Sequence, residues 1–356
     1  MTQARELVVL YGGPSAEHEV SCISALRIAQ AARDSGRPVT IIGLTHDRRW
    51  VAANRTLASI GEGDALASPD VLIAESPGAE LPSLESGVPS DPVVFPLLHG
   101  PFGEDGVIQG HLEAIGLPYV GAGVLSSAIC MDKGVAKSVL REHGLPVAEW
   151  SLIRRAQPGG AAEDAARVLG YPLFVKPANL GSSIGVTKVH GGPSLRDAVA
   201  LAFEFDDYVI LEESVDGREL ELALLGNEEI RVSRAGEIEP SREFYDYADK
   251  YELGLAKALV PTDLTDAQLD RTRDIATRAY RALRVEGLAR IDLFLTGDDS
   301  LVVNEVNTMP GFTPISMYPM LWAAEGLPIG QLIDDLIELA MARHQRRRGL
   351  RTNRLA

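Results

Sequence analysis

Two short segments near the carboxyl end of the chain carry side chains that could bind metal ions and phosphate. One apolar residue separates Arg290 from Asp292, and another separates Glu305 from Asn307. Because side chains alternate between the two faces of a strand, each pair is expected to share one face of two adjacent strands. Carboxylate and amide oxygens suit Mg²⁺ better than zinc, and no His or Cys interrupts either segment. The spacing therefore predicts a magnesium–ATP site.

The same acids have a simpler explanation as half-exposed strand residues that form surface ion pairs, as acids in an acidic protein usually do. The choice depends on lysines that could hold phosphates. Lys176 ends an expected strand and is followed by the glycine-containing segment 177–185. A lysine beside the backbone amides of a flexible turn is what a phosphate site requires. The chain has no Gly-Lys dipeptide, so this turn is not a P-loop.

The turn also matches the pattern Gly-x-Ser-x-Gly, which would make Ser183 a nucleophile. A helix should follow such a serine, but residues 186–189 have the composition of a strand. Only His190 and His344 lie downstream as candidate bases, one of them adjacent and the other in a basic tail. A serine hydrolase is therefore disfavoured.

Two further loops follow expected strands of the N-terminal region. Gly12–Val20 joins a strand to a helix, where glycines permit close approach of a ligand, but it lacks the spacing of a dinucleotide site. Glu17 in this loop could accept a substrate ammonium or cap the helix, and the sequence does not separate the two roles. His99 follows a buried strand at its carboxyl end, where ligands of α/β sheets bind, and is predicted to contact a ligand.

Composition narrows the classes of function. The chain has 356 residues, which predicts two or three domains, and a net charge of −16, which disfavours nonspecific binding to nucleic acid or anionic membranes. It has two cysteines and no apparent leader, so we expect a cytoplasmic protein without disulfides. No apolar run approaches the length of a membrane span. The arginine-rich segment 343–354 is interpreted as a helix end rather than a nucleic-acid arm.

The pattern of apolar residues predicts an α/β fold whose second part begins near Gly121. The first part alternates strands and helices, as a parallel α/β domain does. A polar segment at 242–260 has neither periodicity and is predicted to be a mobile loop. Strands are expected at 6–11, 39–44, 92–98, 173–176, 184–189, 208–213 and 219–225, and helices at 20–35, 107–116, 131–143, 195–205, 266–283 and 331–344.

Seven motifs, in order along the chain, resemble those of the D-alanine:D-alanine ligase family of the ATP-grasp superfamily. They are Gly12–Val20, Leu98–Gly106, Met131–Lys133, Lys176–Ser183, Phe244–Tyr251, Gly287–Asp292 and Asn304–Thr313. The resemblance covers nearly the whole chain. It implies an acid–amino-acid ligase with an ATP-grasp fold: an N-terminal parallel α/β (preATP-grasp) domain at residues 1–120, a central α+β domain at 121–213 and a C-terminal α+β domain at 214–356.

The resemblance also implies the roles of the residues that bind ATP and metal. Lys133 and Lys176 would hold the phosphates, and Glu219 would contact the ribose. The adenine hinge would be formed by Glu212, Glu213 and Val215, and Glu213 stands where some family members have lysine. Two Mg²⁺ ions, for which Mn²⁺ could substitute, would be held by Asp292, Glu305 and Asn307, with Glu305 bridging them.

For chemistry, the resemblance implies that the carboxylate of one D-alanine attacks the γ-phosphate of ATP and that the amine of a second D-alanine displaces phosphate from the resulting acyl phosphate. Arg290 and the Gly311 amide would stabilise the oxyanion of the tetrahedral intermediate. The remaining roles are binding of the first substrate by Glu17 and His99, a hydrogen-bonded triad of Glu17, Ser182 and Tyr251, and binding of the second carboxylate by Lys250 and Ser316.

Tyr251 favours a dipeptide product, because related ligases that make a depsipeptide with D-lactate lack this tyrosine. The resemblance further implies a homodimer and a role in the synthesis of peptidoglycan precursors. Two alternatives remain open. One is a noncatalytic ATP-binding regulator with the same fold, and the other is a ligase for a different amino or hydroxy acid, which the pocket near Tyr245, Lys250 and Ser316 would decide.

Overall fold

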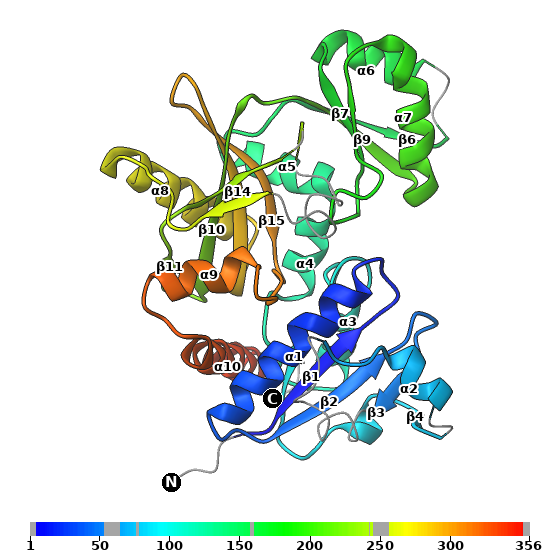
Figure 1. Ribbon diagram of the computed structural model, residues 1–356, viewed down its shortest axis with the longest axis vertical. Coiled ribbons are helices and arrows are strands. Elements are labelled where there is room, and N and C mark those ends of the chain that lie inside the picture. Colours follow the sequence, from blue (N-terminus) through cyan, green and yellow to red (C-terminus); the bar gives the residue numbers. More distant parts are fainter. Residues whose placement is uncertain are drawn as a thin grey trace.

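The computed structural model describes residues 5–52, 65–75, 78–156, 160–241, 243–244 and 256–351. Three sheets, each with its own helices, form three units (Figure 1). The N-terminal unit lies at the bottom of Figure 1, the central unit at the top right, and the C-terminal unit between them. Within the described residues, no helix combines the length and the apolar character needed to span a membrane.

The N-terminal sheet has the strand order β4-β3-β2-β1-β5. Its parallel core consists of β1 (Leu7–Gly12), β2 (Val39–Leu44) and β5 (Val93–Pro96), and β3 (Trp50–Ala52) and β4 (Glu80–Leu81) extend it as antiparallel strands. The helices of this unit are α1 (His18–Asp34), α2 (Pro69–Glu75), the short 3₁₀ helix η2 (Glu85–Gly87) and α3 (Val107–Ala114). Every residue of β1 is buried, which explains its apolar sequence, because a central parallel strand is covered on both faces.

The central unit is a four-stranded antiparallel sheet in the order β6-β9-β7-β8, covered by two helices. Its strands are β6 (Trp150–Arg154), β7 (Leu173–Pro177), β8 (Thr187–Val189) and β9 (Tyr208–Glu213), and its helices are α6 (Ala161–Leu169) and α7 (Gly192–Phe205). The turn between β7 and β8 is the glycine-containing segment identified above. Ser182, Ser183 and Gly185 adopt positive φ angles of 49°, 57° and 69° there, so the turn cannot continue as regular strand.

The C-terminal unit is a six-stranded sheet in the order β13-β12-β10-β14-β15, with β11 paired to β10. The strands are β10 (Gly217–Gly226), β11 (Ile230–Val232), β12 (Gly236–Glu239), β13 (Lys257–Leu259), β14 (Gly287–Thr296) and β15 (Leu301–Asn307). The helices after β13 are α8 (Asp266–Ala282), α9 (Met317–Ala324) and α10 (Ile329–Arg348), and α4 (Val124–Met131) and α5 (Lys133–Glu142) precede the central unit. Buried side chains of α5 pack in one cluster with those of β10 and β14.

The predicted elements agree well with the structure where their pattern is strong. The predicted bounds of β2 and β9 match to the residue, and the helix expected at 131–143 corresponds to α5. Helix α5 begins two residues later than predicted, because Asp132 leaves the helical conformation and caps α5 by accepting a hydrogen bond from the Val135 amide at 2.9 Å. The preceding helix α4, which ends at Met131, was not predicted. The segment predicted as a loop at 242–260 contains the strand β13, whose exposed residues give no alternation to detect.

Helix α10 attaches the C-terminal unit to the N-terminal one and lies beside α1 in Figure 1. Arg343 of α10 is buried and donates hydrogen bonds to the carbonyl oxygens of Tyr119, at 2.7 Å, and Gly121. Its guanidinium also lies 4.3 Å from the centre of the Tyr119 ring. The segment 343–354 is interpreted as a helix end rather than a nucleic-acid arm, and its first residue, Arg343, lies buried within α10.

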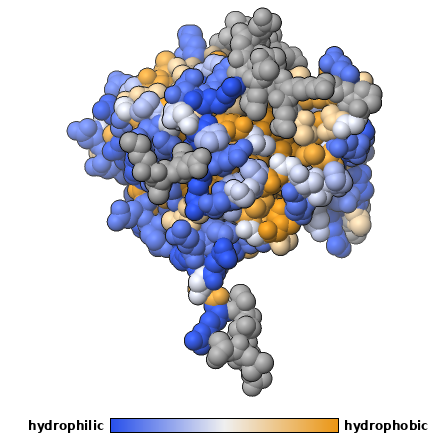
Figure 2. Space-filling model, turned by 90° about the horizontal axis from the view of Figure 1, so that it is seen from below, coloured by the Kyte–Doolittle hydropathy of each residue, from blue (hydrophilic) through white to orange (hydrophobic). Residues whose placement is uncertain are grey.

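On the face shown in Figure 2, polar residues predominate and hydrophobic ones gather near the middle.

Replacing Arg343→Met should lower the free energy of unfolding by roughly 2–4 kcal/mol, because two buried carbonyl groups lose a charged donor. Denaturant unfolding measures the difference. Arg348→Met, at an exposed position on the same helix, serves as the control. Equal stability of the two variants would mean that the Arg343 contacts contribute nothing net.

Candidate active site

The acids and the arginine predicted to share strand faces lie opposite one another on β14 and β15. Arg290 pairs with Asn307, and Asp292 pairs with Glu305, as expected for adjacent strands. On the other side of β14, Glu221 of β10 stands opposite Asp292. Sequence reasoning missed Glu221, because its strand lies far from β14 in the chain and the register cannot be inferred from either strand alone. Three carboxylates therefore form a row across three strands.

Arg290 is the cation within this row. Its Nε and a terminal nitrogen donate to the two carboxylate oxygens of Asp292 at 2.8 and 2.7 Å, and its Nε lies 3.1 Å from Glu221 Oε2. Burial acts to lower the pKa of Arg290, but the charges of Asp292 and Glu221 outweigh it and raise the pKa well above its ordinary value. Arg290 thus remains charged inside the protein. Asn307 Nδ2 donates to Asp292 at 3.1 Å and completes the network.

Two cavities meet at this row of side chains. The first, of about 130 Å³, is lined by Glu17, His99, Ser182, Arg290, Glu305, Asn307, Gly311 and Ser316, among others. The second, of about 100 Å³, is lined by Lys133, Lys176, Ser182, Glu212, Glu213, Val215, Glu219 and Glu305, among others. Residues expected to bind amino acid thus line one cavity, and those expected to bind nucleotide line the other. Ser182 and Glu305 border both.

Among the described site residues, Asp292 lines neither cavity. It is 2% exposed and is hydrogen-bonded to Arg290. Lys250 and Tyr251 lie outside the described residues, as does Tyr245. The roles assigned to these last three residues therefore stay predictions from the sequence.

Glu17 stands at the N-cap position of α1, but its side chain makes no capping hydrogen bond. Instead, it accepts a hydrogen bond from the Ser182 hydroxyl, 165 residues away in the chain. A Cβ atom at Gly100 would lie 2.7 Å from Glu17 Oε2, and one at Gly181 would lie 2.9 Å from it. The two glycines thus leave the room that this carboxylate needs. Helix capping, the alternative left open by the sequence, does not explain the position of Glu17.

His99 is buried at the wall of the first cavity. Its Nδ1 lies 3.1 Å from the Met309 carbonyl oxygen, which can only accept, so this nitrogen carries the proton. Its Nε2 is buried and has no hydrogen-bond partner among the described residues. Burial lowers the pKa of His99. A neutral imidazole with one unsatisfied acceptor in a cavity fits a ligand contact better than a core residue.

The loop after β15 brings Gly311 and Ser316 to the same cavity. The Ser316 hydroxyl accepts a hydrogen bond from the Thr313 amide at 3.0 Å, and the Phe312 amide donates to Ser24 of α1 at 3.1 Å. Arg27 of α1 donates to the Thr313 carbonyl oxygen at 2.5 Å. The loop is therefore held against the N-terminal unit by hydrogen bonds from α1.

Lys133 and Lys176 supply positive charge to the second cavity, and the buried Glu212 lies beside Lys176. Lys133 opens α5, and its ammonium donates to the Leu180 carbonyl oxygen at 2.6 Å. Lys176 and Lys137 lie 2.8 and 2.9 Å from the two carboxylate oxygens of Glu212. Burial would raise the pKa of Glu212, but the two ammonium groups lower it to about 2. Lys137 was missed by sequence reasoning, although it stands four residues after Lys133 on the same helix.

Glu104 is another missed residue of the first cavity, inside the motif that supplied His99. Its Oε2 accepts a hydrogen bond from the Gly100 amide at 2.7 Å. Burial, reinforced by the nearby charge of Glu17, raises the pKa of Glu104 to about 8. Glu104 is therefore largely protonated at neutral pH.

The raised pKa of Glu104 predicts a pH-dependent stability. The folded protein binds a proton that the unfolded chain releases near pH 4.3, so the stabilisation is complete below about pH 4.3 and is lost as the pH rises toward 8. The glutamine side chain in Glu104→Gln is neutral at every pH, so this variant does not lose that stabilisation as the pH rises. Its free energy of unfolding relative to the wild type should therefore increase by about 1.4 kcal/mol per pH unit between pH 5 and 8. Denaturant unfolding measures the free energy of unfolding of both proteins at each pH. The same pH dependence in the wild type and the variant would mean that Glu104 is ionised throughout this range.

Comparison with known proteins gives the same assignment for the whole chain. The family model for the D-ala D-ala ligase N-terminus matches residues 6–122, and that for the D-ala D-ala ligase C-terminus matches residues 139–338. The D-alanine–D-alanine ligase of Geobacillus thermodenitrificans is 44% identical over 347 residues, 95% of each chain. The D-alanine–D-alanine ligase A of Salmonella typhimurium is 44% identical over 355 residues, 97% of this chain and 98% of the relative.

Solved structures agree with these matches. The D-alanine–D-alanine ligase of Coxiella burnetii superimposes with a TM-score of 0.85 at 36% identity, covering 98% of this chain and 97% of that one. The VanG D-Ala:D-Ser ligase of Enterococcus faecalis gives a TM-score of 0.82 at 35% identity, covering 95% of this chain and all of the other. The three-unit architecture, the two adjoining cavities and these matches lead to one conclusion: the chain belongs to the D-alanine–D-alanine ligase family.

Proposed function

We propose that this protein joins two molecules of D-alanine into D-alanyl-D-alanine, with conversion of ATP to ADP and phosphate, and so supplies a precursor of peptidoglycan in the cytoplasm. The observation that carries the proposal is the junction of the two cavities at Ser182 and Glu305. Lysine side chains line one cavity, and the Glu17 carboxyl group and the His99 imidazole line the other. A nucleotide phosphate and an amino acid would meet at this junction.

Asp292, Glu305 and Asn307 fit the Mg²⁺ ions that the family implies. All three offer hard oxygen donors, and Glu305 lies between the cavities. Hydrogen bonds from Arg290 and Asn307 hold the carboxylate of Asp292 in place beside Glu305. We assign two Mg²⁺ ions, replaceable by Mn²⁺, to this set. When bound, these ions supply positive charge to the phosphates of ATP.

The first step joins the carboxylate of one D-alanine to the γ-phosphorus of ATP. Glu17 accepts the substrate ammonium, and His99 lies beside it, so the carboxylate is turned toward the phosphate. Lys133 and Lys176 hold the phosphates while the γ-phosphorus–oxygen bond to ADP breaks. The products are ADP and an acyl phosphate. Positioning and cations do most of the work in such transfers, and no protein nucleophile is required.

The second step joins the amine of the other D-alanine to the acyl carbon. The tetrahedral intermediate carries a negative oxygen, which the charged Arg290 and the Gly311 amide stabilise. The carbon–oxygen bond to phosphate then breaks, and phosphate leaves. Ser316 binds the carboxylate of the incoming D-alanine, with Lys250 assigned to the same group and Tyr251 to a triad with Glu17 and Ser182, on the family resemblance.

Product analysis tests the proposal. The protein is incubated with ATP, Mg²⁺ and one of D-alanine, L-alanine, D-lactate with D-alanine, or D-serine with D-alanine, and products are identified by mass. We expect D-alanyl-D-alanine with D-alanine and no turnover with L-alanine. D-Serine is included because the VanG relative is a D-Ala:D-Ser ligase. No D-alanine-dependent phosphate release from protein that binds ATP would favour a noncatalytic regulator or another ligase.

Glu305→Gln should reduce turnover by at least roughly 100-fold, because the residue that borders both cavities loses its charge toward the metal ions. Asp298→Asn, an exposed acid-to-amide change in the turn between β14 and β15, is the matched control. Steady-state phosphate release with D-alanine measures both variants. Wild-type activity in Glu305→Gln would remove this residue from the metal site.

Lys137 is expected to keep Lys176 available to phosphate, because it neutralises the carboxylate that both lysines share. Lys137→Met leaves Glu212 and Lys176 as a neutral pair, so ATP affinity should fall roughly tenfold. Adding Glu212→Gln removes the carboxylate and should restore most of the affinity. Calorimetric titration with ATP compares the wild type, the single variant and the double variant. A double variant as weak as Lys137→Met would mean that Lys137 acts through packing alone.

We also assign a homodimer to this protein, on the family resemblance. Light scattering across a range of protein concentrations tests the assembly. A monomer at every concentration would exclude it.

A further inference from the structure

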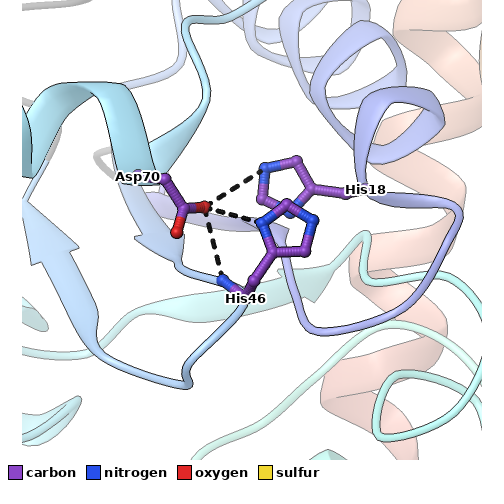
Figure 3. Close-up of side chains that lie close together, drawn as sticks. All are labelled: His18, His46 and Asp70. Atoms are coloured by element: carbon purple, nitrogen blue, oxygen red, sulfur yellow. Dashed lines mark hydrogen bonds and ion pairs between the residues drawn. The ribbon is translucent and has the colours of Figure 1, made fainter.

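A second group of potential metal ligands lies outside both cavities, at the carboxyl end of the N-terminal parallel strands. His18 is the first residue of α1, His46 follows β2, and Asp70 lies in the first turn of α2. One ligand atom from each lies within 4.8 Å of the other two. Figure 3 shows the Asp70 carboxylate pointing toward both imidazole rings. Three separate elements thus bring two nitrogens and one oxygen close together.

His18 is already held in the form that binds a metal through Nε2. Its side chain is 1% exposed, and its Nδ1 lies 2.8 Å from the Gly13 carbonyl oxygen. A carbonyl oxygen only accepts, so Nδ1 carries the proton and the lone pair of the neutral ring is on Nε2. Metal-binding histidines are oriented by this kind of contact. Nε2 faces the Ser68 hydroxyl at 3.0 Å and Asp70 Oδ2 at 4.0 Å.

His46 and Asp70 complete the group from the solvent side. His46 Nδ1 lies 2.9 Å from Asp70 Oδ2, and their side chains are 52% and 38% exposed. A metal ion can therefore reach them from solution and take the place of the proton between them. A tetrahedral ion with bonds of about 2.0–2.1 Å places its ligands roughly 3.3–3.4 Å apart. The separations of 2.9 and 4.0 Å lie on either side of this value.

One rearrangement is required. The rings of His18 and His46 are stacked, with centroids 4.1 Å apart and planes 11° from parallel. A metal lies in the plane of each imidazole that binds it, so two parallel rings cannot share one ion. His18 is fixed by burial and by Gly13, whereas the half-exposed ring of His46 can rotate. Metal binding must therefore break the stack by turning His46.

We propose that His18, His46 and Asp70 bind a transition-metal dication of the Zn²⁺ class, with a fourth ligand from water. Imidazole nitrogens exclude Mg²⁺ as the preferred ion and favour Zn²⁺, Ni²⁺ or Cu²⁺. The bound ion joins the start of α1, the loop after β2 and the start of α2. Cys22 of α1 is not a ligand, because burial raises the pKa of its thiol to about 12. None of these three ligands is among the residues assigned to the ligase reaction.

Titration calorimetry with ZnCl₂ tests this site. Excess Mg²⁺ is kept in the cell, so that the oxygen ligands of the active site are occupied. We expect one Zn²⁺ per wild-type chain, and affinity at least tenfold weaker in His46→Ala and in Asp70→Asn. His143→Ala, which removes an exposed histidine after α5, should bind as the wild type does. Both test positions are exposed, and circular dichroism checks that each variant is folded.

Nuclear magnetic resonance of the imidazole protons supplies an independent readout. Zn²⁺ should shift the ring signals of His18 and His46 together and leave those of His143 unchanged, because only the first two rings lose their stacking. Equal Zn²⁺ affinity in the wild type, His46→Ala and Asp70→Asn would overturn the proposal. So would the absence of Zn²⁺ binding by the wild-type protein, or a titration that leaves the His18 and His46 signals unmoved.

Discussion

The site depends on a row of like charges that the sheet forces together. Glu221, Asp292 and Glu305 face one another across β10, β14 and β15, and like charges at directly opposed positions destabilise a sheet. Arg290 forms ion pairs with Glu221 and Asp292 and offsets part of this repulsion. Cations in the adjoining cavities would offset more of it. The structural cost of this row thus agrees with the proposed binding of metal ions beside it.

Three segments from different parts of the chain bring side chains and backbone to the first cavity beside this row. The start of α1 brings Glu17, the β7–β8 turn brings Ser182, and the loop after β15 brings Gly311. These segments belong to three different units, so the first cavity exists only when the units are packed together. Arg27 and Ser24 of α1 hold the loop after β15 through its backbone. Packing between the N-terminal and C-terminal units therefore sets the geometry of the proposed oxyanion site.

Much of this arrangement could be predicted from the sequence, because alternation along a strand is a local property. The face shared by Arg290 and Asp292 follows from a spacing of two residues, and the loop positions of Glu17 and His99 follow from the strands before them. The position of Glu221 could not be predicted, since it depends on the register between strands far apart in the chain. Helix α4 was missed, and the start of α5 was predicted two residues early, because a single non-helical residue, Asp132, separates the two helices.

Glu305 borders both cavities, and this shared wall has a thermodynamic consequence. Any ligand that changes the charge or position of this carboxylate from one side changes the binding free energy on the other. Such coupling is reciprocal, so the factor by which nucleotide alters amino-acid affinity equals the factor by which amino acid alters nucleotide affinity. A side chain shared in this way would make the two proposed binding events one linked equilibrium.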